Sequence, residues 1–218
     1  MFDTVFFDLD GTLLDTLEDL AQACNWVCRR HGWPTYPTEQ FKRFVGNGAA
    51  KLLERVAPPE HITPQLRQET MEEFTQYYNA HKTDHTRVYP GMPQALEELG
   101  RSGVSMAVLS NKPDQAARPV VERYYPGVFP FVQGALDGVP VKPDPTALFA
   151  LMERMGAQRE DTLFVGDSDV DIQTAKNAGL AGCGVLWGFR TRAELEREGA
   201  DYIAVQPQDL LGIILGHE

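Results

Sequence analysis

The sequence predicts an α/β protein, a Rossmann-like doubly wound parallel sheet with an inserted all-helical cap domain. Short apolar runs of strand length alternate with amphipathic helical segments along most of the chain, which is typical of a parallel sheet covered by helices. The stretch 17–82 breaks this alternation because it contains helical patterns only. We therefore expect a core domain formed by residues 1–16 and 83–218, and a helical cap formed by residues 17–82.

The first expected strand is the apolar run Val5–Phe7, which ends shortly before Gly11, where a residue without Cβ can turn the chain. In the cap, apolar periodicity predicts helices over Leu17–His31, from Thr38 onward, around Leu52–Val56 and over Leu66–Ala80. The segment Thr38–Gln40 has the pattern of a helix N-cap, whereas Gly32–Pro34 and Pro58–Pro59 end the helices before them.

Alternation of strands and helices resumes after Tyr89–Gly91. The expected helices are Met92–Arg101, Gln115–Tyr124, Ala147–Met155, Ile172–Ala178 with a stop at Gly179, and Arg192–Glu198. The expected strands are Val104–Leu109, a short piece near Phe131, Thr162–Val165, Gly184–Trp187 and Tyr202–Val205. Because a helix joins each strand to the next, this order predicts a mostly parallel sheet.

The composition is that of an ordinary folded protein, with 43% hydrophobic and 23% charged residues among 218. The formal net charge of -11 argues against nucleic acid and anionic membranes as partners, because both bind clusters of Lys and Arg. No long apolar segment and no basic leader is present, so we expect a cytoplasmic protein. Cys24, Cys28 and Cys183 lack the spacing of a metal or redox motif and are expected to be buried.

Polar side chains that can carry chemistry follow several of the expected strands. Asp8 and Asp10 come after the first strand, Ser110 after a second and Asp167 after a third. Parallel strands deliver their carboxyl ends to one side of a sheet, so these side chains can converge, together with Lys142 before a later helix. Two close carboxylates repel each other, which predicts either a hard metal ion between them or a nucleophile paired with an acid.

Four motifs in this order resemble those of the haloacid dehalogenase superfamily of phosphotransferases: Asp8–Thr12, Ser110, Lys142 and Gly166–Asp171. The resemblance covers essentially the whole chain. It implies that Asp8 attacks phosphorus to form an aspartyl-phosphate, and that Asp10 protonates the leaving oxygen and then activates water. Ser110 and Lys142 would stabilise the transferring phosphoryl group.

The same resemblance implies Mg²⁺ as the cofactor, because this ion prefers oxygen ligands. Its ligands would be the side chains of Asp8 and Asp167 and the backbone carbonyl of Asp10. Asp171 would lie behind these ligands and orient Lys142 or a metal-bound water. An acid at position 10 marks the phosphatase and mutase branches of the superfamily, because the dehalogenase branch lacks it.

The helical insertion resembles the cap of phosphoglycolate phosphatases and β-phosphoglucomutases. Its segment Phe44–Gly48 is similar to a cap loop of the phosphoglycolate phosphatase group, where Gly46, Asn47 and Gly48 would bring backbone N–H groups to an anionic substrate. A plain turn between helices is the alternative. Further expected substrate contacts are Gly11, Thr12 and Asn111, with Arg43 and Lys51 as partners for a substrate carboxylate.

The predicted function is Mg²⁺-dependent hydrolysis of a small phosphorylated metabolite by a monomer or homodimer, with 2-phosphoglycolate as the first candidate substrate. A sugar-phosphate mutase or a pyrophosphatase on the same fold is one alternative. A mutase must protect its phosphoenzyme from water, and no cap feature in the sequence demands this. A non-catalytic binding module is the other alternative, but the expected nucleophile, Lys and metal ligands are all present.

Overall fold

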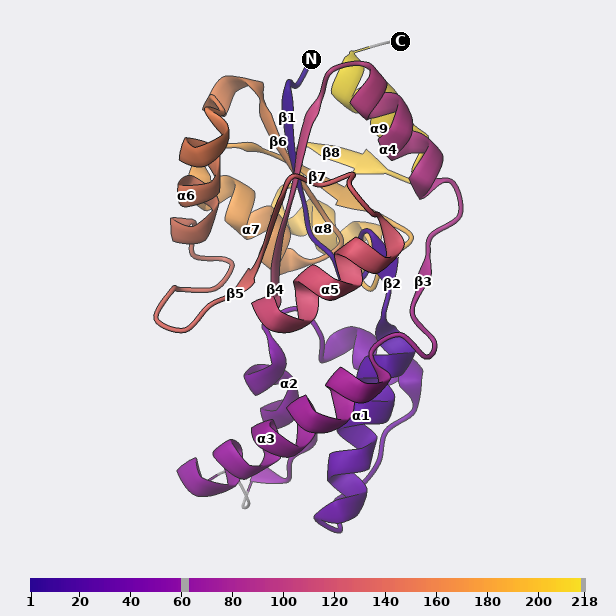
Figure 1. Ribbon diagram of the computed structural model, residues 1–218, viewed down its shortest axis with the longest axis vertical. Coiled ribbons are helices and arrows are strands. Elements are labelled where there is room, and N and C mark those ends of the chain that lie inside the picture. The colour runs from indigo at the N-terminus through magenta and orange to yellow at the C-terminus, as the bar shows by residue number, and fades with distance from the viewer. Residues whose placement is uncertain (60–62, 217–218) are drawn as a thin grey trace.

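The computed structural model describes residues 1–59 and 63–216, and a six-stranded parallel sheet forms its centre (Figure 1). The strands are β1 (Thr4–Phe7), β4 (Ser105–Pro113), β5 (Phe131–Ala135), β6 (Thr162–Gly166), β7 (Ala181–Val185) and β8 (Tyr202–Ala204). They lie in the order β5-β4-β1-β6-β7-β8, and all neighbouring pairs are parallel. The first strand therefore lies inside the sheet, between β4 and β6.

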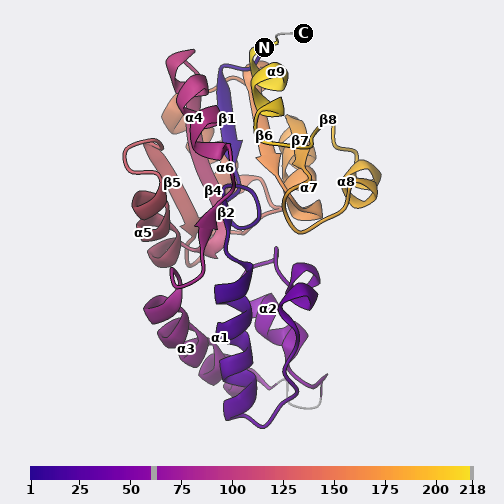
Figure 2. The same cartoon turned by 90° about the vertical axis from the view of Figure 1, so that its right-hand side faces the viewer.

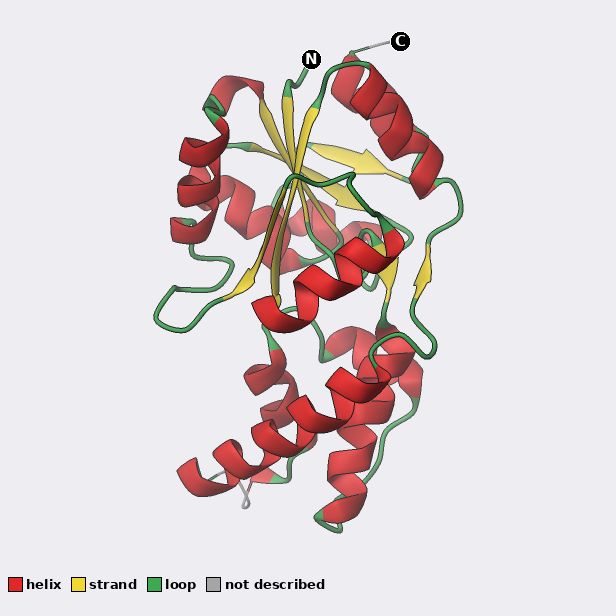
Figure 3. Ribbon diagram, in the orientation of Figure 1, coloured by secondary structure: helices red, strands yellow, loops and turns green. Residues whose placement is uncertain are grey.

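Helices cover both faces of this sheet (Figure 3). One face is covered by α4 (Met92–Arg101), α5 (Asp114–Tyr124) and α9 (Asp209–Leu215). The other face is covered by α6 (Thr146–Met155) and α7 (Asp169–Ala178), with α8 (Arg192–Glu198) beside α7 and a short 3₁₀ turn, η3 (Arg159–Asp161), before β6. Side chains of β1 alternate between the two helical layers: Val5 and Phe7 pack toward the first set of helices and Phe6 toward the second.

The helical unit, residues 17–81, lies at the end of the sheet to which the strand arrows point (Figures 1 and 2). It consists of α1 (Leu17–Arg30), the 3₁₀ helix η1 (Thr38–Arg43), α2 (Ala49–Val56) and α3 (Pro64–His81). Its buried side chains, among them Cys24, Phe41 and Phe74, form an apolar cluster separate from the two clusters of the core. A short antiparallel pair, β2 (Leu14–Asp15) and β3 (Arg87–Val88), connects the unit to the core.

The return of the chain from the helical unit is held by Asp19 of α1, which is buried. Its carboxylate accepts hydrogen bonds from the backbone N–H groups of His85 and Thr86, each at 2.9 Å, and from Thr86 Oγ1 at 2.7 Å. A buried carboxylate with three donors is well satisfied, so this contact fixes the position of α1 against the second connecting strand.

The predicted α/β class is confirmed, and most helices lie within a few residues of their expected bounds. Two strands differ: β4 continues to Pro113, so Ser110 and Lys112 lie within the strand, and β7 begins at Ala181 instead of Gly184. The predicted N-cap at Thr38 is wrong, because Pro37 holds that position and Thr38 Oγ1 donates to Glu18 Oε2 at 2.8 Å. Residues 60–62 of the predicted cap and residues 217–218 of the predicted core lie outside the described residues.

Four of the described elements were not predicted: β2, β3, α9 and the short turn η3. Strands of two residues are too short to show a period, and α9 is an apolar run that Gly212 interrupts. All three cysteines are buried and unpaired, as expected. No helix among the described residues has the length and apolar character needed to cross a bilayer.

Candidate active site

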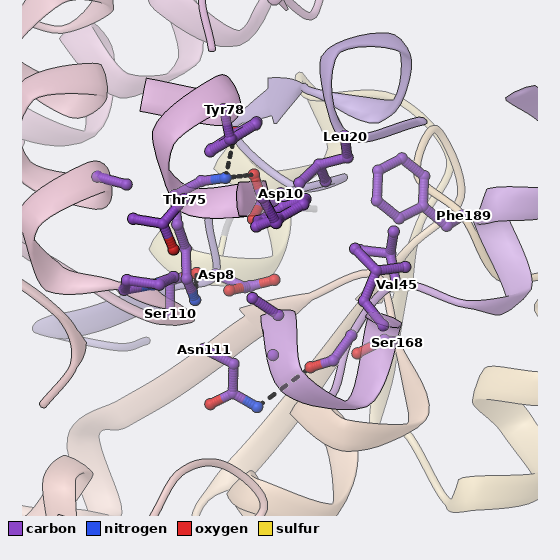
Figure 4. Close-up of a pocket in the computed structure, with 18 of the residues that line it drawn as sticks. Asp8, Asp10, Leu20, Val45, Thr75, Tyr78, Ser110, Asn111, Ser168 and Phe189 are labelled. Atoms are coloured by element: carbon purple, nitrogen blue, oxygen red, sulfur yellow. Dashed lines mark hydrogen bonds and ion pairs between the residues drawn. The ribbon is translucent and has the colours of Figure 1, made fainter. Parts of the chain in front are cut away.

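A cavity lies where the carboxyl ends of β1, β4 and β6 face the helical unit, and residues of both line it (Figure 4). The helical unit contributes mainly apolar and uncharged side chains: Leu20, Val45, Ala49, Leu52, Phe74, Thr75, Tyr78 and Asn79. The charged side chains of the lining all come from the core and are Asp8, Asp10, Lys112 and Asp167. Three carboxylates and a single ammonium therefore face a largely uncharged wall.

Asp8 directly follows β1 and is oriented by Lys142, which lies in the loop before α6. Lys142 Nζ donates to Asp8 Oδ1 at 2.8 Å and to Asp171 Oδ1 at 2.7 Å, and all three side chains are buried. Burial raises the pKa of Asp8 to about 7, Lys142 opposes this shift, and the Asp171 and Asp10 carboxylates reinforce it. Lys142 thus lies behind Asp8 as seen from the cavity, which Asp8 lines and Lys142 does not, and it donates to one of the two Asp8 oxygens.

Asp171 is fully engaged by its neighbours in the first turn of α7. Its Oδ2 accepts hydrogen bonds from Ser168 N at 3.0 Å and from Ser168 Oγ at 2.6 Å, which closes the capping box of that helix. Its Oδ1 accepts the hydrogen bond from Lys142. Of the two roles that the sequence left open for Asp171, the structure therefore supports the orientation of Lys142.

Asp167, which follows β6, is enclosed by two glycines and two hydrogen-bond donors. Phe189 N donates to its Oδ2 at 2.8 Å, and Thr12 Oγ1 donates to its Oδ1 at 3.3 Å. A Cβ at Gly11, where φ is +86°, would lie 2.4 Å from Asp167 Oδ2, and a Cβ at Gly188 would lie 2.3 Å from Asp167 Cβ. Both positions therefore require glycine.

The donor set fits a hard divalent cation. Carboxylate oxygens of Asp8, Asp167 and Asp171 lie within 4.8 Å of one another. Burial and the Asp171 and Asp8 carboxylates raise the pKa of Asp167 well above its ordinary range, which shows how strongly this cluster disfavours negative charge without a cation. Asp171 accepts three hydrogen bonds, whereas Asp167 accepts two and Asp8 accepts one, so Asp8 and Asp167 have more lone pairs left for a metal.

Asp10 points into the cavity from the other side and has two donors on one oxygen. Its Oδ1 accepts hydrogen bonds from Thr16 Oγ1 at 2.6 Å and from Lys112 Nζ at 2.9 Å. Lys112 Nζ also donates to the hydroxyl of Tyr78, on α3, at 2.6 Å. Burial lowers the pKa of Lys112, but the Asp10 carboxylate and the Tyr78 hydroxyl outweigh it and raise that pKa above its ordinary value. Lys112 thereby joins Asp10 to the helical unit.

Ser110 and Asn111 lie in the last part of β4, and both line the cavity. Ser110 Oγ accepts a hydrogen bond from Lys112 N at 3.3 Å, which leaves its hydroxyl hydrogen able to donate toward the cavity. The Asn111 side chain accepts from Lys142 N at 2.8 Å and donates to Lys142 O at 2.9 Å and to Gly46 O at 3.1 Å. Asn111 therefore holds the backbone of Lys142 and the loop of the helical unit in place.

The loop before α2 faces the cavity through Gly46 and Gly48, as the sequence led us to expect, but not through Asn47. Asn47 Oδ1 instead accepts a hydrogen bond from Arg55 Nη2 at 2.6 Å, on the opposite side of the loop. The Asn47 side chain thus makes a contact within the helical unit, and the expected contact of the loop's backbone N–H groups with substrate stays a prediction. The hydrogen bond between Asn47 and Arg55 fixes the shape of the loop.

Two further expected substrate contacts, Gly11 and Thr12, also lie outside the lining of the cavity. Gly11 N donates to Leu14 O at 2.8 Å and Thr12 N donates to Leu9 O at 3.3 Å, so their N–H groups close the turn after β1. In the structure both residues support Asp167, and a contact of either with substrate stays a prediction. Neither Arg43, which is exposed, nor Lys51, which pairs with Glu54 at 2.9 Å, lines the cavity.

Sequence reasoning missed two groups that join the core to the helical unit. The first is Lys112 with Tyr78, for which a signal existed, because Ser110 and Lys112 are two residues apart and share one face of a strand. The second is Arg190, which donates to Lys42 O, to Val45 O at 2.9 Å and to Asp169 Oδ1 at 3.2 Å. No sequence pattern identifies Arg190, because its partners are mostly backbone carbonyls distant along the chain.

Comparisons with known proteins agree with this geometry. The family model of the haloacid dehalogenase-like hydrolases matches residues 5–185. A phosphoglycolate phosphatase of Vibrio parahaemolyticus is 34% identical over an alignment of 220 positions, which covers 96% of this chain and 95% of that protein. A phosphoglycolate phosphatase of Aquifex aeolicus is 31% identical over 214 residues, which cover 98% and 97%.

Solved structures show the same fold along the whole chain. A protein of Lactobacillus delbrueckii subsp. bulgaricus, provisionally assigned as a phosphoglycolate phosphatase, superimposes with a TM-score of 0.93 at 32% identity and 99% coverage of both chains. CbbY of Rhodobacter sphaeroides, solved in complex with phosphate, has a TM-score of 0.80 at 21% identity over 96% of each chain, a likeness of fold alone.

The fold, the cluster of acids at the strand ends and the family match together define the class: this chain belongs to the haloacid dehalogenase-like hydrolase family. Within that family it falls in the phosphoglycolate phosphatase-like group. It is a phosphatase.

Proposed function

We propose that this phosphatase hydrolyses a small phosphomonoester through an aspartyl-phosphate, with Mg²⁺ as cofactor and 2-phosphoglycolate as the first candidate substrate. The observation that carries the proposal is the environment of Asp8. It is a buried carboxylate at the end of the central strand, with one oxygen held by Lys142 and with Asp167 beside it. The names of the relatives, which are 34% and 31% identical, support the choice of substrate.

In this mechanism Asp8 attacks phosphorus with the oxygen that Lys142 does not hold, and the bond from phosphorus to the leaving oxygen breaks. Asp10 gives its proton to that leaving oxygen and then takes a proton from the water that hydrolyses the aspartyl-phosphate. Lys142 and the Ser110 hydroxyl supply positive charge and a hydrogen bond to the phosphoryl oxygens.

Asp8, Asp167 and the backbone carbonyl of Asp10 would hold Mg²⁺, which when bound offsets the negative charge of the carboxylates and of the phosphoryl group. The residues around these ligands keep them in place: Asp171 orients Lys142, and Gly11, Thr12 and Phe189 enclose Asp167.

The helical unit would act as the cap over this site. It supplies the largely apolar wall of the cavity, which lowers the amount of water around the reacting groups and shapes the space for the leaving group. Its loop before α2 is tied to the core by Arg190 and Asn111. We infer that these two residues keep the cap loop close to the phosphoryl site.

The test is phosphate release from a panel of small phosphomonoesters, with Mg²⁺ and with a chelator. The panel contains 2-phosphoglycolate, sugar phosphates, nucleoside monophosphates and pyrophosphate. We expect release that depends on Mg²⁺ and is fastest for 2-phosphoglycolate. Broad, weak release would support the reaction and contradict the substrate. Undiminished release under chelation would contradict the role of Asp167, and no release from any compound would contradict the proposed function.

Binding of Mg²⁺ is expected to tighten as the pH rises from about 5 to 8. Burial raises the pKa of Asp8 to about 7 and raises the pKa of Asp167, so the metal-free folded protein holds protons that the unfolded chain has released. The contribution of these two carboxyls to stability therefore falls as the pH rises from about 4 to about 7, and bound Mg²⁺ offsets that loss. Calorimetric titration in buffers of different ionisation enthalpy would show proton release on binding. An affinity that does not change with pH would contradict this prediction.

A further inference from the structure

We propose, on the basis of the function proposed above, that Lys112 determines substrate specificity by binding a carboxylate on the carbon that bears the leaving oxygen. The substrate class that fits is the phosphomonoesters of small 2-hydroxy acids, of which 2-phosphoglycolate is the smallest. The proposal rests on the number of donors that Lys112 has left, on the charges of the cavity lining, and on the position of Lys112 beside Asp10.

Lys112 has one hydrogen-bond donor to spare. An ammonium group carries three N–H donors. One is used by Asp10 Oδ1 at 2.9 Å and one by the Tyr78 hydroxyl at 2.6 Å. No third acceptor for Lys112 is found among residues 1–59 and 63–216, although its side chain is buried and lines the cavity. A buried N–H without a partner is costly, so a substrate that supplies an acceptor there gains affinity.

Lys112 is also the one cationic side chain among the described residues of the cavity lining. Lys142 is held behind Asp8 by two carboxylates, and Lys51 and Arg55 line a different hollow on the far side of the cap loop. The other charged groups of the lining are carboxylates, which repel an anionic leaving group. A leaving group that carries a carboxylate therefore has a single side chain here with which to form an ion pair.

The position of Lys112 selects where that carboxylate must be. Asp10 is the proposed acid for the leaving oxygen, and Lys112 Nζ lies 2.9 Å from Asp10 Oδ1. Figure 4 shows Tyr78 and Asp10 together on the side of the cavity opposite Asn111. A group that contacts both the leaving oxygen and Lys112 must be short. In an ester of a 2-hydroxy acid, the leaving oxygen and the carboxylate are attached to the same carbon, which satisfies this condition.

The experiment compares the Lys112→Met variant with the wild type on two substrates of similar size: 2-phosphoglycolate, and 2-hydroxyethyl phosphate, in which an uncharged hydroxymethyl group replaces the carboxylate. We expect the ratio of their kcat/KM values to favour 2-phosphoglycolate in the wild type and to fall by about 10- to 100-fold in the variant, the range for loss of a hydrogen bond to a charged group. An equal loss on both substrates would show that Lys112 only positions Asp10, and would overturn the proposal.

A matched variant separates specificity from positioning. Thr16→Val removes the other donor to Asp10 Oδ1 and leaves both partners of Lys112 in place. It is expected to lower kcat/KM on the two substrates alike, without a change in their ratio. Thermal melting checks that each variant folds. If Lys112→Met does not fold, Lys112→Gln, which keeps a hydrogen-bond donor without the charge, is judged by the same ratio.

Equilibrium binding gives a second readout that does not need turnover. In the Asp8→Asn background, Lys112→Met should weaken binding of 2-phosphoglycolate by about 10-fold or more and leave that of inorganic phosphate unchanged. Equal weakening of both ligands would overturn the proposal. If the wild type hydrolyses both esters equally well, the proposed phosphatase function stands and the role of Lys112 in specificity is overturned. A wild type that hydrolyses neither contradicts the proposed function, and the binding comparison then decides the role of Lys112.

Discussion

Replacing Asp8 with Asn is expected to lower phosphatase turnover by about 10⁴-fold or more. An amide oxygen is not nucleophilic enough to attack phosphorus, so no aspartyl-phosphate can form. The change is nearly isosteric, and Lys142 Nζ can still donate to the side-chain oxygen at position 8, as it does now at 2.8 Å. Phosphate release from 2-phosphoglycolate with Mg²⁺ measures the effect, and circular dichroism confirms the fold.

The same variant should not be less stable at pH 8 without metal. The pKa of Asp8 is raised to about 7, so its ionisation above that pH costs folding free energy, and a neutral side chain removes this cost. The matched control is Asp137→Asn, the same change at an exposed site, which should leave turnover unchanged. An Asp8→Asn protein that retains wild-type turnover would refute the nucleophile assignment.

The sheet could be predicted from the sequence because its strands are buried on both faces. A run such as Val5–Phe7 is apolar at every position since helices cover both sides, and its alternation with helical segments fixes a parallel arrangement. The end of β4 was placed too early for the opposite reason. Ser110, Asn111 and Lys112 are polar, but they are buried within the strand, and each side chain has a hydrogen-bond partner.

Residues whose role depends on the fold of distant segments could not be assigned from the sequence alone. Gly11 and Thr12 were expected at the substrate because they follow the acids, yet their backbone N–H groups are taken by the turn itself. Arg190 donates to a backbone carbonyl of the cap loop. Residues of every type have a backbone carbonyl, so the sequence does not mark which one Arg190 binds. Such contacts are set by three-dimensional proximity, which periodicity and spacing do not encode.

The acids of the site were predictable in kind because charge repulsion limits what adjacent carboxylates can do. Asp8 and Asp167 do lie beside each other, with Lys142 between Asp8 and Asp171. The role of Asp171 needed the structure, since only the two hydrogen bonds from Ser168 show that its second oxygen is engaged. The sequence thus identifies the acids of the site, and the hydrogen bonds assign their tasks.

Replacing Lys142 with Met is expected to abolish most of the turnover and to destabilise the protein by about 3–5 kcal/mol at neutral pH, the usual cost of leaving buried partners of an ion pair uncompensated. Burial lowers the pKa of Lys142, but Asp171 and Asp8 outweigh this and raise it, so the ammonium stabilises the fold up to about pH 10 wherever these carboxyls are ionised. Its removal leaves Asp8, Asp167 and Asp171 as three close buried carboxylates.

This destabilisation should be smaller at pH 5.5 than at pH 8, because Asp8, whose pKa is about 7 even with Lys142 present, takes up a proton at the lower pH. Mg²⁺ should recover part of the lost stability at pH 8, since the cation replaces the missing positive charge. It should raise the free energy of unfolding of the variant by more than it raises that of the wild type. Urea unfolding at both pH values, with and without Mg²⁺, measures these differences. The matched control is Lys176→Met, an exposed lysine whose loss should change the stability by less than about 0.5 kcal/mol. Equal destabilisation at both pH values, together with no response to Mg²⁺, would show that Lys142 stabilises the fold by packing and not by its charge.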